Sequence, residues 1–360
     1  MKAAVCRAFG APLVIEDVVL AEPGPGEVQV RMAATAICHS DVTYAAGGWG
    51  GELPAIYGHE GAGYVERIGA GVTNVSVGDH VVVTLIRSCG HCHGCVTGKP
   101  VTCETSFPLD ERTPLSDASG APIVQAMRTG AFAERVVVHA SQIVTVPDDL
   151  PLDSASLLAC GVITGFGAVV NTAAVEPGSH VVVIGCGGVG LNAVQGGRVC
   201  GAQTVIAVDV SDTKLEAALR FGATHTVNSA TTDVVAAVLE TTRGRGADYV
   251  FVTVGAKAAF DQSYSLLAKG GAVVLVGMPA NGVTSEIDPG TMAAYSHRIV
   301  GSKMGSARVP IDIPNLVALY RQGRVMLDEL ITGRYPLEEI NEAIASLKRG
   351  EALRNVIVFE

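Results

Sequence analysis

The sequence predicts a two-domain α/β fold, in which a β-rich domain accompanies a domain built on a doubly wound parallel sheet. Three observations lead to this prediction. The chain has 360 residues, enough for about two domains of roughly 100–200 residues each. Hydrophobic residues make up 48% and charged residues 17%, which is typical of a globular protein with a large core. Near residue 155 the pattern changes from short strands to strands that alternate with helices.

The first 150 residues are predicted to be mostly β-structure. Glycine and proline separate short strand-like runs, and helical periodicity is sparse. After a strand-like alternation over residues 1–20, the predicted strands are 27–37, 61–72, 79–86 and 131–141.

The following segment predicts a parallel sheet. Strands are expected at 179–185, 204–210, 247–255 and 271–277, and they alternate with helices that include 188–201 and 211–222. Because these strands are apolar along their whole length, we expect helices on both faces of the sheet. After residue 310, two amphipathic helices, "IPNLVALYRQGR" and "LEEINEAIASLKRG", precede a final strand, "RNVIVFE".

Charge and hydropathy narrow the possible partners and the expected location. The net charge is −10 and no basic run occurs, which argues against nucleic acid and anionic membranes as partners. No apolar run reaches the roughly 18 residues of a membrane span, and the first 20 residues lack the pattern of a signal peptide. We therefore expect a cytoplasmic protein, whose nine cysteines favour metal binding or catalysis over disulfides.

A glycine-rich segment predicts a dinucleotide site. Gly185, Gly187 and Gly190 fit the G-x-G-x-x-G pattern between a predicted strand and a predicted helix, and the next strand ends at Asp209. The helix N-terminus can bind a pyrophosphate. Asp209 can accept hydrogen bonds from a ribose 2′-OH and would repel a 2′-phosphate, so NAD is favoured over NADP. The alternative is an ordinary strand–helix turn without a ligand.

Four cysteines predict a closed metal site. Their spacing is C-x₂-C-x₂-C-x₇-C, at Cys89, Cys92, Cys95 and Cys103. Four thiolates suit a tetrahedral structural zinc with no open position; an iron–sulfur cluster is the alternative. His91 and His93 lie between these ligands, but a filled tetrahedron leaves no place for them, and we expect both on the exposed surface of the loop.

The other five cysteines divide into two groups. Cys6, Cys186 and Cys200 are expected to be small core or loop residues. Cys38 and Cys160 could join His59 in a Cys₂His set with one open zinc position, which is the catalytic type. These residues lie far apart in the sequence, so spacing alone leaves this grouping a hypothesis.

Several stretches of the chain resemble the zinc-dependent medium-chain alcohol dehydrogenases. They are "GHEGAGYVERIGAGVTNVSVGDHV", the four-cysteine segment, "CGVITGFGAVVNTAAVEPGSHVVVIGCGGVGL" and "ALRNVIVF". The chain resembles the branch that holds the animal-liver type and the aryl-alcohol and thiol-adduct formaldehyde dehydrogenases. The resemblance implies a GroES-like catalytic zinc domain over 1–160 and 303–360, and a Rossmann NAD-binding domain over 161–302.

The resemblance also implies roles for individual residues. Cys38, His59 and Cys160 match the family's catalytic zinc ligands, Glu60 a transient ligand, Ser40 the hydroxyl that accepts the substrate proton, and Asp41 the acid that orients the zinc-binding histidine. Thr164 matches a residue beside the nicotinamide, Arg354 a contact to the pyrophosphate, and Gly188, Val189 and Lys214 complete the predicted NAD-binding residues.

Two positions depart from the liver-type pattern. His39 stands where that branch often has an arginine near the pyrophosphate; it carries less charge at neutral pH, so we expect faster release of NADH. Thr43 stands where many relatives have a histidine that passes the proton to solvent. Because a hydroxyl cannot hold that charge, water or His39 would complete the proton relay. The alternative for each residue is a solvated side chain without a kinetic role.

The implied function is the reversible oxidation of an alcohol to its aldehyde or ketone, with two zinc ions per chain and NAD. Trp49 and Leu85 align near the substrate pocket; Trp49 would narrow it, and Leu85 would leave room. We expect primary alcohols, benzylic or medium-chain aliphatic, with a thiol-adduct formaldehyde dehydrogenase as the alternative. A zinc- and NAD-binding protein without turnover is disfavoured because every predicted ligand and Ser40 are present. The segment from Cys103 to Phe132 is long, as in the dimeric members of the family, so the resemblance implies a homodimer through strand pairing of the NAD-binding domains, with a strand near 295–304 at the interface.

Overall fold

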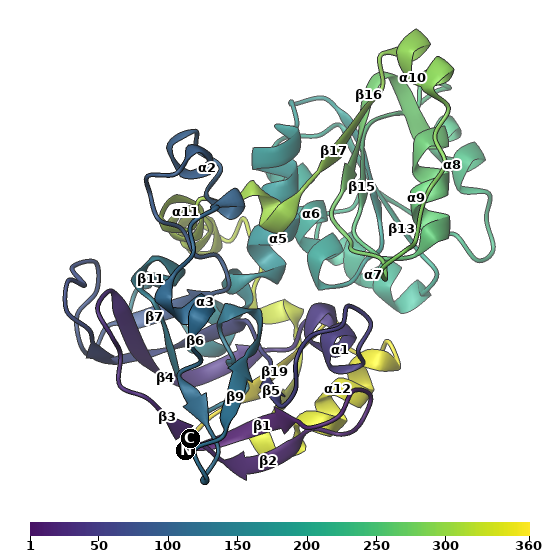
Figure 1. The fold of residues 1–360 in the computed structure, drawn as a ribbon. Helices are drawn as coiled ribbons and strands as arrows, with labels where there is room; N and C mark the ends of the chain where they lie inside the picture. Colours follow the sequence, from purple (N-terminus) through teal and green to yellow (C-terminus); the bar gives the residue numbers. More distant parts are fainter. The chain divides into compact units, whose positions relative to one another are not determined.

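The computed structural model describes residues 1–360 and divides them into two compact units (Figure 1). The first unit comprises Met1–Cys160 and Arg308–Glu360, and the second comprises Gly161–Ala307. The chain thus returns to the first unit at Arg308, slightly later than the position 303 predicted from the sequence.

The first unit is built from two sheets. One has the strand order β2-β1-β5-β9-β8-β3; the other has the order β11-β7-β6-β4-β19-β18, with β10 also paired to β4. The strands are β1 (Lys2–Cys6), β2 (Val14–Asp17), β3 (Val19–Leu20), β4 (Glu27–Ala36), β5 (Ala55–Ile56), β6 (Glu60–Ile68), β7 (His80–Thr84), β8 (Leu115–Ser116), β9 (Pro122–Gln125), β10 (Arg135–His139), β11 (Ile143–Thr145), β18 (Ile331–Tyr335) and β19 (Arg354–Val358).

Helices of the first unit are short except near its C-terminus. They are α1 (His39–Ala45), α2 (His93–Val96), α3 (Pro108–Glu111), α4 (Leu152–Ser156), α11 (Val309–Arg321) and α12 (Ile340–Lys348). The two amphipathic helices predicted after residue 310 correspond to α11 and α12. No single helix of the chain is long and apolar enough to cross a membrane; one bent pair, Leu152–Ala159 with Gly161–Ala173, could do so by length and composition alone.

The predicted strand at 131–141 is only partly correct. β10 begins at Arg135: the Glu134 carbonyl still accepts the Met32 amide of β4 at 2.9 Å, but the Glu134 amide donates to the Lys2 carbonyl at 3.1 Å. The Ala131 and Phe132 amides donate to the carbonyls of Gly58 and Tyr57 at 2.9 Å each. This pairing holds the turn before His59 against the sheet, which matters for the site described below.

The second unit contains a six-stranded parallel sheet with the order β14-β13-β12-β15-β16-β17. Its strands are β12 (His180–Ile184), β13 (Thr204–Asp209), β14 (His225–Asn228), β15 (Ala247–Val252), β16 (Leu267–Leu275) and β17 (Arg298–Gly301). Its helices are α5 (Gly161–Gly167), α6 (Gly188–Val199), α7 (Asp212–Arg220), α8 (Val234–Thr241), α9 (Lys257–Ser263) and α10 (Pro289–Tyr295). Figure 1 shows α5 and α6 on one face of the sheet and α8 and α9 on the other, as the apolar strands predicted.

The strand order of this sheet reverses at β12. Chain order runs outward from β12 through β13 to β14, and then resumes on the other side of β12 with β15. Ligands of doubly wound sheets bind beyond the carboxyl ends of the strands where the order reverses. The glycine-rich segment directly follows β12, so it lies at this reversal.

Candidate active site and metal centres

Asp41 connects two segments that carry predicted metal ligands. Cys38 is the N-cap of α1, and Asp41 is three residues further on. The Asp41 carboxylate accepts a hydrogen bond from the Cys38 amide at 3.0 Å and from the Gly58 amide at 3.0 Å. The first bond is the acidic half of a capping box, which fixes the start of α1. One buried carboxylate therefore holds both Cys38 and the residue before His59.

The same carboxylate orients the His59 ring. Asp41 accepts the Nδ1 proton of His59 at 2.9 Å, and each side chain is 1% exposed. When the ring is neutral and donates from Nδ1, Nε2 is the nitrogen whose lone pair could bind a metal. Nε2 is buried and has no hydrogen-bond partner. Burial lowers the pKa of the ring, but Asp41 and Cys38 outweigh it and hold the pKa of His59 well above its usual value.

Cys38, His59, Glu60 and Cys160 form a buried cluster. One ligand atom from each lies within 4.8 Å of the others. A hydrogen bond from Cys160 holds the pKa of the Cys38 thiol well below its usual value in spite of burial, and His59 acts in the same direction. Two thiolates and an unpartnered imidazole nitrogen are the donor set of a catalytic zinc with an open position. The residues therefore fit a zinc ion.

Glu60 is paired with Arg354. The two side chains are buried, and the Arg354 guanidinium donates to the Glu60 carboxylate. Burial raises the pKa of Glu60, although Arg354 opposes this change. The sequence did not reveal this pair, which spans 294 residues; it forms because β4 pairs with both β6 and β19. The predicted contact of Arg354 with a pyrophosphate stays a prediction.

The α1 residues that the proton relay would use differ in their exposure and in their hydrogen bonds. Ser40 is half-buried, with its Oγ 3.7 Å from the Cys38 sulfur. The Thr43 hydroxyl donates to the His39 carbonyl at 2.9 Å, so its proton is already committed within the helix. The His39 side chain is exposed. Which group completes the proton relay stays a prediction.

The two residues aligned with a substrate pocket are partly buried. The Trp49 ring packs edge-on against Tyr44 of α1 at a centroid distance of 4.9 Å, and Tyr44 in turn stacks on Tyr57 at 6.1 Å. Leu85 directly follows β7 and is half-buried. The structure thus supplies Trp49 with an aromatic support that the sequence did not indicate.

The four-cysteine lobe, residues 89–103, has the geometry expected of a structural zinc site. Its four sulfurs lie within 4.8 Å of one another. The amides of His91 and Cys92 donate to the Cys89 sulfur at 3.4 and 3.2 Å, and the Cys89 amide donates to Cys103 at 3.4 Å. Hydrogen bonds from the Thr105 hydroxyl, which contributes most, and from the His91 and Cys92 amides lower the pKa of Cys89 to about 5. Burial raises the pKa of Cys95 to about 11; a bound zinc would deprotonate it.

The two histidines of the lobe lie outside this cluster. Both are exposed, and the His91 Nδ1 contacts the Cys89 carbonyl at 2.9 Å. Neither belongs to the group of ligand atoms that the four sulfurs form.

The glycine loop has the shape that a pyrophosphate needs. Gly185 has φ +95°, and a Cβ there would collide with Val254. A Cβ at Gly190 would collide with the Gly185 carbonyl, so only glycine allows α6 to approach the strand this closely. At Gly187 no atom lies within 4 Å of the position that a Cβ would take, which leaves open space beside the backbone. Gly188 and Val189 begin α6, whose free amides can bind an anion. The loop fits a dinucleotide.

Asp209 makes structural contacts with the glycine loop, while its predicted contact with a ribose stays a prediction. At the end of β13 its carboxylate accepts the Cys186 amide at 2.7 Å and the Ser211 amide at 3.0 Å. It therefore holds the glycine loop next to the start of α7, where Lys214 is half-buried. Thr164 is buried on α5. The sequence did not indicate the contact between Asp209 and the loop.

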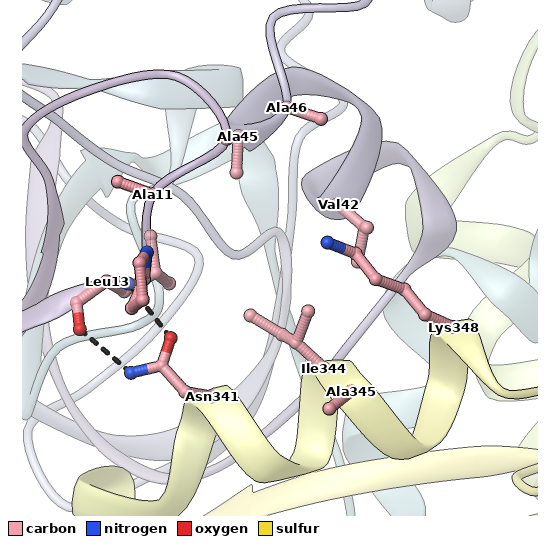
Figure 2. A pocket seen from close by; sticks show the side chains of 11 residues that line it. Ala11, Leu13, Val42, Ala45, Ala46, Asn341, Ile344, Ala345 and Lys348 are labelled. Carbon is pink, nitrogen blue, oxygen red and sulfur yellow. Dashed lines mark hydrogen bonds between the residues drawn. The ribbon is translucent and has the colours of Figure 1, made fainter.

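A surface hollow of about 190 Å³ lies among the β1–β2 loop, α1 and α12. Figure 2 shows Ile344 and Lys348 of α12 pointing toward α1, where Val42 faces them. Asn341 hydrogen-bonds the Leu13 amide and carbonyl, each at 2.9 Å. None of the predicted catalytic or metal-binding residues lines this hollow, so it is separate from the candidate active site.

Comparisons with known proteins agree with this geometry. The alcohol dehydrogenase GroES-like domain matches residues 24–148, and the zinc-binding dehydrogenase family matches residues 188–322. An NDMA-dependent alcohol dehydrogenase of Amycolatopsis methanolica is 39% identical over 99% of this chain and 98% of its own length.

Two further relatives differ in the substrates that their names state. A probable S-(hydroxymethyl)glutathione dehydrogenase 1 of Schizosaccharomyces pombe is 37% identical, over 99% of this chain and 96% of its own. The crystal structure of benzyl alcohol dehydrogenase from Acinetobacter calcoaceticus superposes with a TM-score of 0.94 at 34% identity, and the match covers 100% of this chain and 99% of that one.

Proposed function

Because the chain belongs to the zinc-dependent medium-chain alcohol dehydrogenases, we propose that it interconverts primary alcohols, benzylic or medium-chain aliphatic, and their aldehydes with NAD(H). Membership of the family makes the chain a zinc-dependent alcohol oxidoreductase. The observation that carries the proposal is the buried cluster of Cys38, His59 and Cys160, in which the His59 Nε2 atom has no protein partner.

Metal binding, orientation of the histidine and proton transfer are assigned to different residues in and beside the cluster. Cys38, His59 and Cys160 would hold zinc, which supplies Lewis-acid polarisation of an alcohol or aldehyde oxygen when bound. Asp41 fixes the tautomer and orientation of His59. The Ser40 hydroxyl is the proposed proton acceptor, since it lies beside the Cys38 sulfur. From Ser40 the proton reaches solvent through water or His39, because the Thr43 hydroxyl donates to a backbone carbonyl.

Benzylic and medium-chain aliphatic alcohols are favoured by the pocket residues. Trp49 presents a ring that Tyr44 supports edge-on, and aromatic pairs of this kind prefer such offset or edge-on contacts. Leu85 leaves more room than an aromatic side chain would. The similarity to a benzyl alcohol dehydrogenase supports this substrate class. The similarity to an S-(hydroxymethyl)glutathione dehydrogenase keeps the thiol adduct of formaldehyde as the second candidate.

A substrate panel tests the proposal. The purified protein, with its zinc content measured, is offered benzyl alcohol, a series of straight-chain alcohols and S-hydroxymethylglutathione, and NADH absorbance is followed. We expect the highest kcat/KM with benzyl or medium-chain alcohols. A clear preference for the glutathione adduct would replace the first proposal with the second, and no turnover of any of them would contradict both.

NAD is the proposed cofactor because Asp209 ends β13 at the edge of the glycine loop. We expect Asp209→Ala to shift the ratio of kcat/KM for NADP over NAD upward by roughly 10- to 100-fold, since the variant loses charge-assisted hydrogen bonds to the ribose and the repulsion of a 2′-phosphate. Asp209→Asn is the matched variant, because its amide oxygen can still accept the Cys186 amide while the charge is removed. An unchanged ratio in both variants would contradict the ribose contact.

A homodimer is the proposed assembly. β17 is the edge strand of the parallel sheet and pairs only with β16. An unpaired strand edge of this kind can be covered by the same strand of a second copy. The strand occupies Arg298–Gly301, within the predicted interval 295–304. A solution mass of one chain, measured by light scattering, would contradict the dimer. The cytoplasmic location stays a prediction.

A further inference from the structure

A buried hydroxyl lies next to the backbone that carries one catalytic ligand. Thr84 is the last residue of β7 and is 0% exposed. Its Oγ1 donates to the carbonyl of Ala159 at 2.7 Å, and Ala159 immediately precedes Cys160. Thr84 is also the register partner of Glu60 on β6. Thr84 therefore lies next to the backbone of Cys160 and next to Glu60 without contributing a metal ligand.

Gln142 continues this hydrogen-bonded chain away from the cluster. It is 0% exposed, and its Nε2 donates to the carbonyls of Thr84 at 2.8 Å and Arg128 at 3.0 Å. Its Oε1 accepts the Nε proton of Arg87 at 2.9 Å. Both ends of the amide are thus used, which fixes its orientation and links the backbone of β7 to Arg87.

Arg87 connects the chain to the four-cysteine lobe. It lies two residues before Cys89, and its Nη1 donates to Asp110 at 2.9 Å. The guanidinium also lies over the Phe107 ring at 5.4 Å. Phe107 and Asp110 belong to the segment at α3 that leaves the lobe after Cys103. Arg87 therefore joins the segment between β7 and the lobe to the segment that follows the lobe.

The arrangement is costly for the protein, which argues for a role. Arg87 is 2% exposed, and its Nη2 is buried without a hydrogen-bond partner. Burial lowers the pKa of its guanidinium, while Asp110 raises it. The Arg87 side chain is 0% exposed, whereas that of Asp110 is 24% exposed, so the guanidinium loses its hydration for a partner that remains partly in water. What the charged side chain provides here is a directional link between the lobe and β7.

We propose that Thr84, Gln142 and Arg87 are positioning residues that hold Cys160 for zinc and make zinc retention there depend on the folded lobe. The inference rests on the zinc cluster of the proposed function. Hydrogen bonds to the groups around metal ligands commonly change metal affinity by about 10- to 100-fold. The path consists of three hydrogen bonds, which join Ala159 to Thr84, Thr84 to Gln142, and Gln142 to Arg87.

The first test compares Thr84→Val with Thr84→Ser. Valine keeps the shape of threonine but cannot donate to Ala159, whereas serine keeps the hydroxyl. The full-length holoenzyme is dialysed against a chelator, and the zinc remaining on the protein is counted over time. We expect Thr84→Val to lose zinc from the Cys38 cluster about 10- to 100-fold faster than the wild type, with Thr84→Ser close to the wild type and the lobe zinc unchanged in both. The Cys38→Ala variant identifies which phase belongs to the cluster.

The second test addresses the link to the lobe. Arg87→Lys keeps the charge beside Asp110 but cannot reach both Gln142 and Asp110 with the planar geometry of a guanidinium. We expect it, too, to release the cluster zinc about 10-fold faster. Arg128→Gln is the matched control, because the Arg128 side chain pairs with the same Asp110 at 3.4 Å but does not contact Gln142. This control should retain both zinc ions as the wild type does.

The outcomes separate the two proposals. A wild-type protein that holds zinc in the lobe but none in the Cys38 cluster would contradict the proposed function itself. If the wild type shows both phases and Thr84→Val releases its cluster zinc at the wild-type rate, the positioning role alone is wrong. Equal acceleration of both phases, together with a lowered thermal midpoint, would also overturn it, because that pattern reports general destabilisation.

Discussion

The Cys38→Ala variant is expected to lose about 10³-fold or more in kcat/KM for alcohol oxidation while it still binds NAD. The estimate assumes that the metal contributes several kcal/mol, about 4, to stabilising charge in the transition state. The loss follows from the donor set, because Cys38, His59 and Cys160 fit one zinc ion and the variant removes a thiolate from three ligands. NAD binding should persist, because the glycine loop belongs to the second unit.

Cys38→Ala separates the loss of metal from a loss of stability better than His59→Ala does. Removal of the imidazole would leave the buried Asp41 carboxylate without its ring partner, and this would add a loss of stability to the loss of metal. Cys6→Ala is the matched control, because Cys6 is a buried thiol of the same unit outside the cluster. Kinetics, calorimetric titration with NAD and zinc analysis form the measurement. Full turnover in a Cys38→Ala protein that has lost one zinc would contradict the assigned role.

The Arg354→Met variant is expected to destabilise the first unit by about 3–5 kcal/mol, the usual cost of removing one partner from a buried ion pair. Both Arg354 and Glu60 are buried. Without the Arg354 guanidinium, the Glu60 carboxylate would remain buried without its charge partner. Burial and the neighbouring Cys38 thiolate already raise the pKa of Glu60. The free energy of unfolding, measured with denaturant, reports this loss.

Arg349→Met provides the control for this prediction. Arg349 also pairs with carboxylates, Glu342 and Glu351, but all three side chains are about half exposed. Exposed ion pairs contribute little to stability, so this variant should stay near the wild type. The double variant Glu60→Gln with Arg354→Met should recover part of the lost stability, because the neutral amide no longer buries a charge. Similar effects of Arg354→Met and Arg349→Met would contradict the importance of burial.

Features set by local sequence were predicted well. The parallel strands of the second unit and the glycine loop follow from apolar runs, glycine spacing and the position of Asp209, all within about one strand–helix–strand unit. The open space at Gly187 and the close approach at Gly190 are what this motif requires. The four cysteines of the lobe likewise lie within one short segment, and the structure brings their sulfurs together.

Features that depend on distant pairing were not derivable in the same way. The grouping of Cys38, His59 and Cys160 came from family resemblance, because spacing carries no information when the ligands belong to separate segments. The Glu60–Arg354 pair and the Thr84–Ala159 bond span 294 and 75 residues. They are consequences of how β4, β6, β7 and β19 pair in one sheet, and strand pairing order is not encoded in the local pattern.

Boundaries also shifted where tertiary contacts compete with local propensity. Residues 131–134 have the composition of a strand, but their amides bond to segments at 57–58 and 2, so β10 starts later than its sequence suggests. Similarly, β16 begins at Leu267, before the predicted apolar run, because Leu267 pairs with Ala247 across a bulge. In both cases the partner strand sets the boundary.

The most direct test of the central claim is a crystallographic measurement of anomalous scattering at the zinc absorption edge. The account predicts two peaks per chain, one bounded by Cys38, His59 and Cys160 and one among the four sulfurs of the lobe. A single peak in the lobe, with the Cys38 cluster empty in protein that oxidises alcohols, would contradict it.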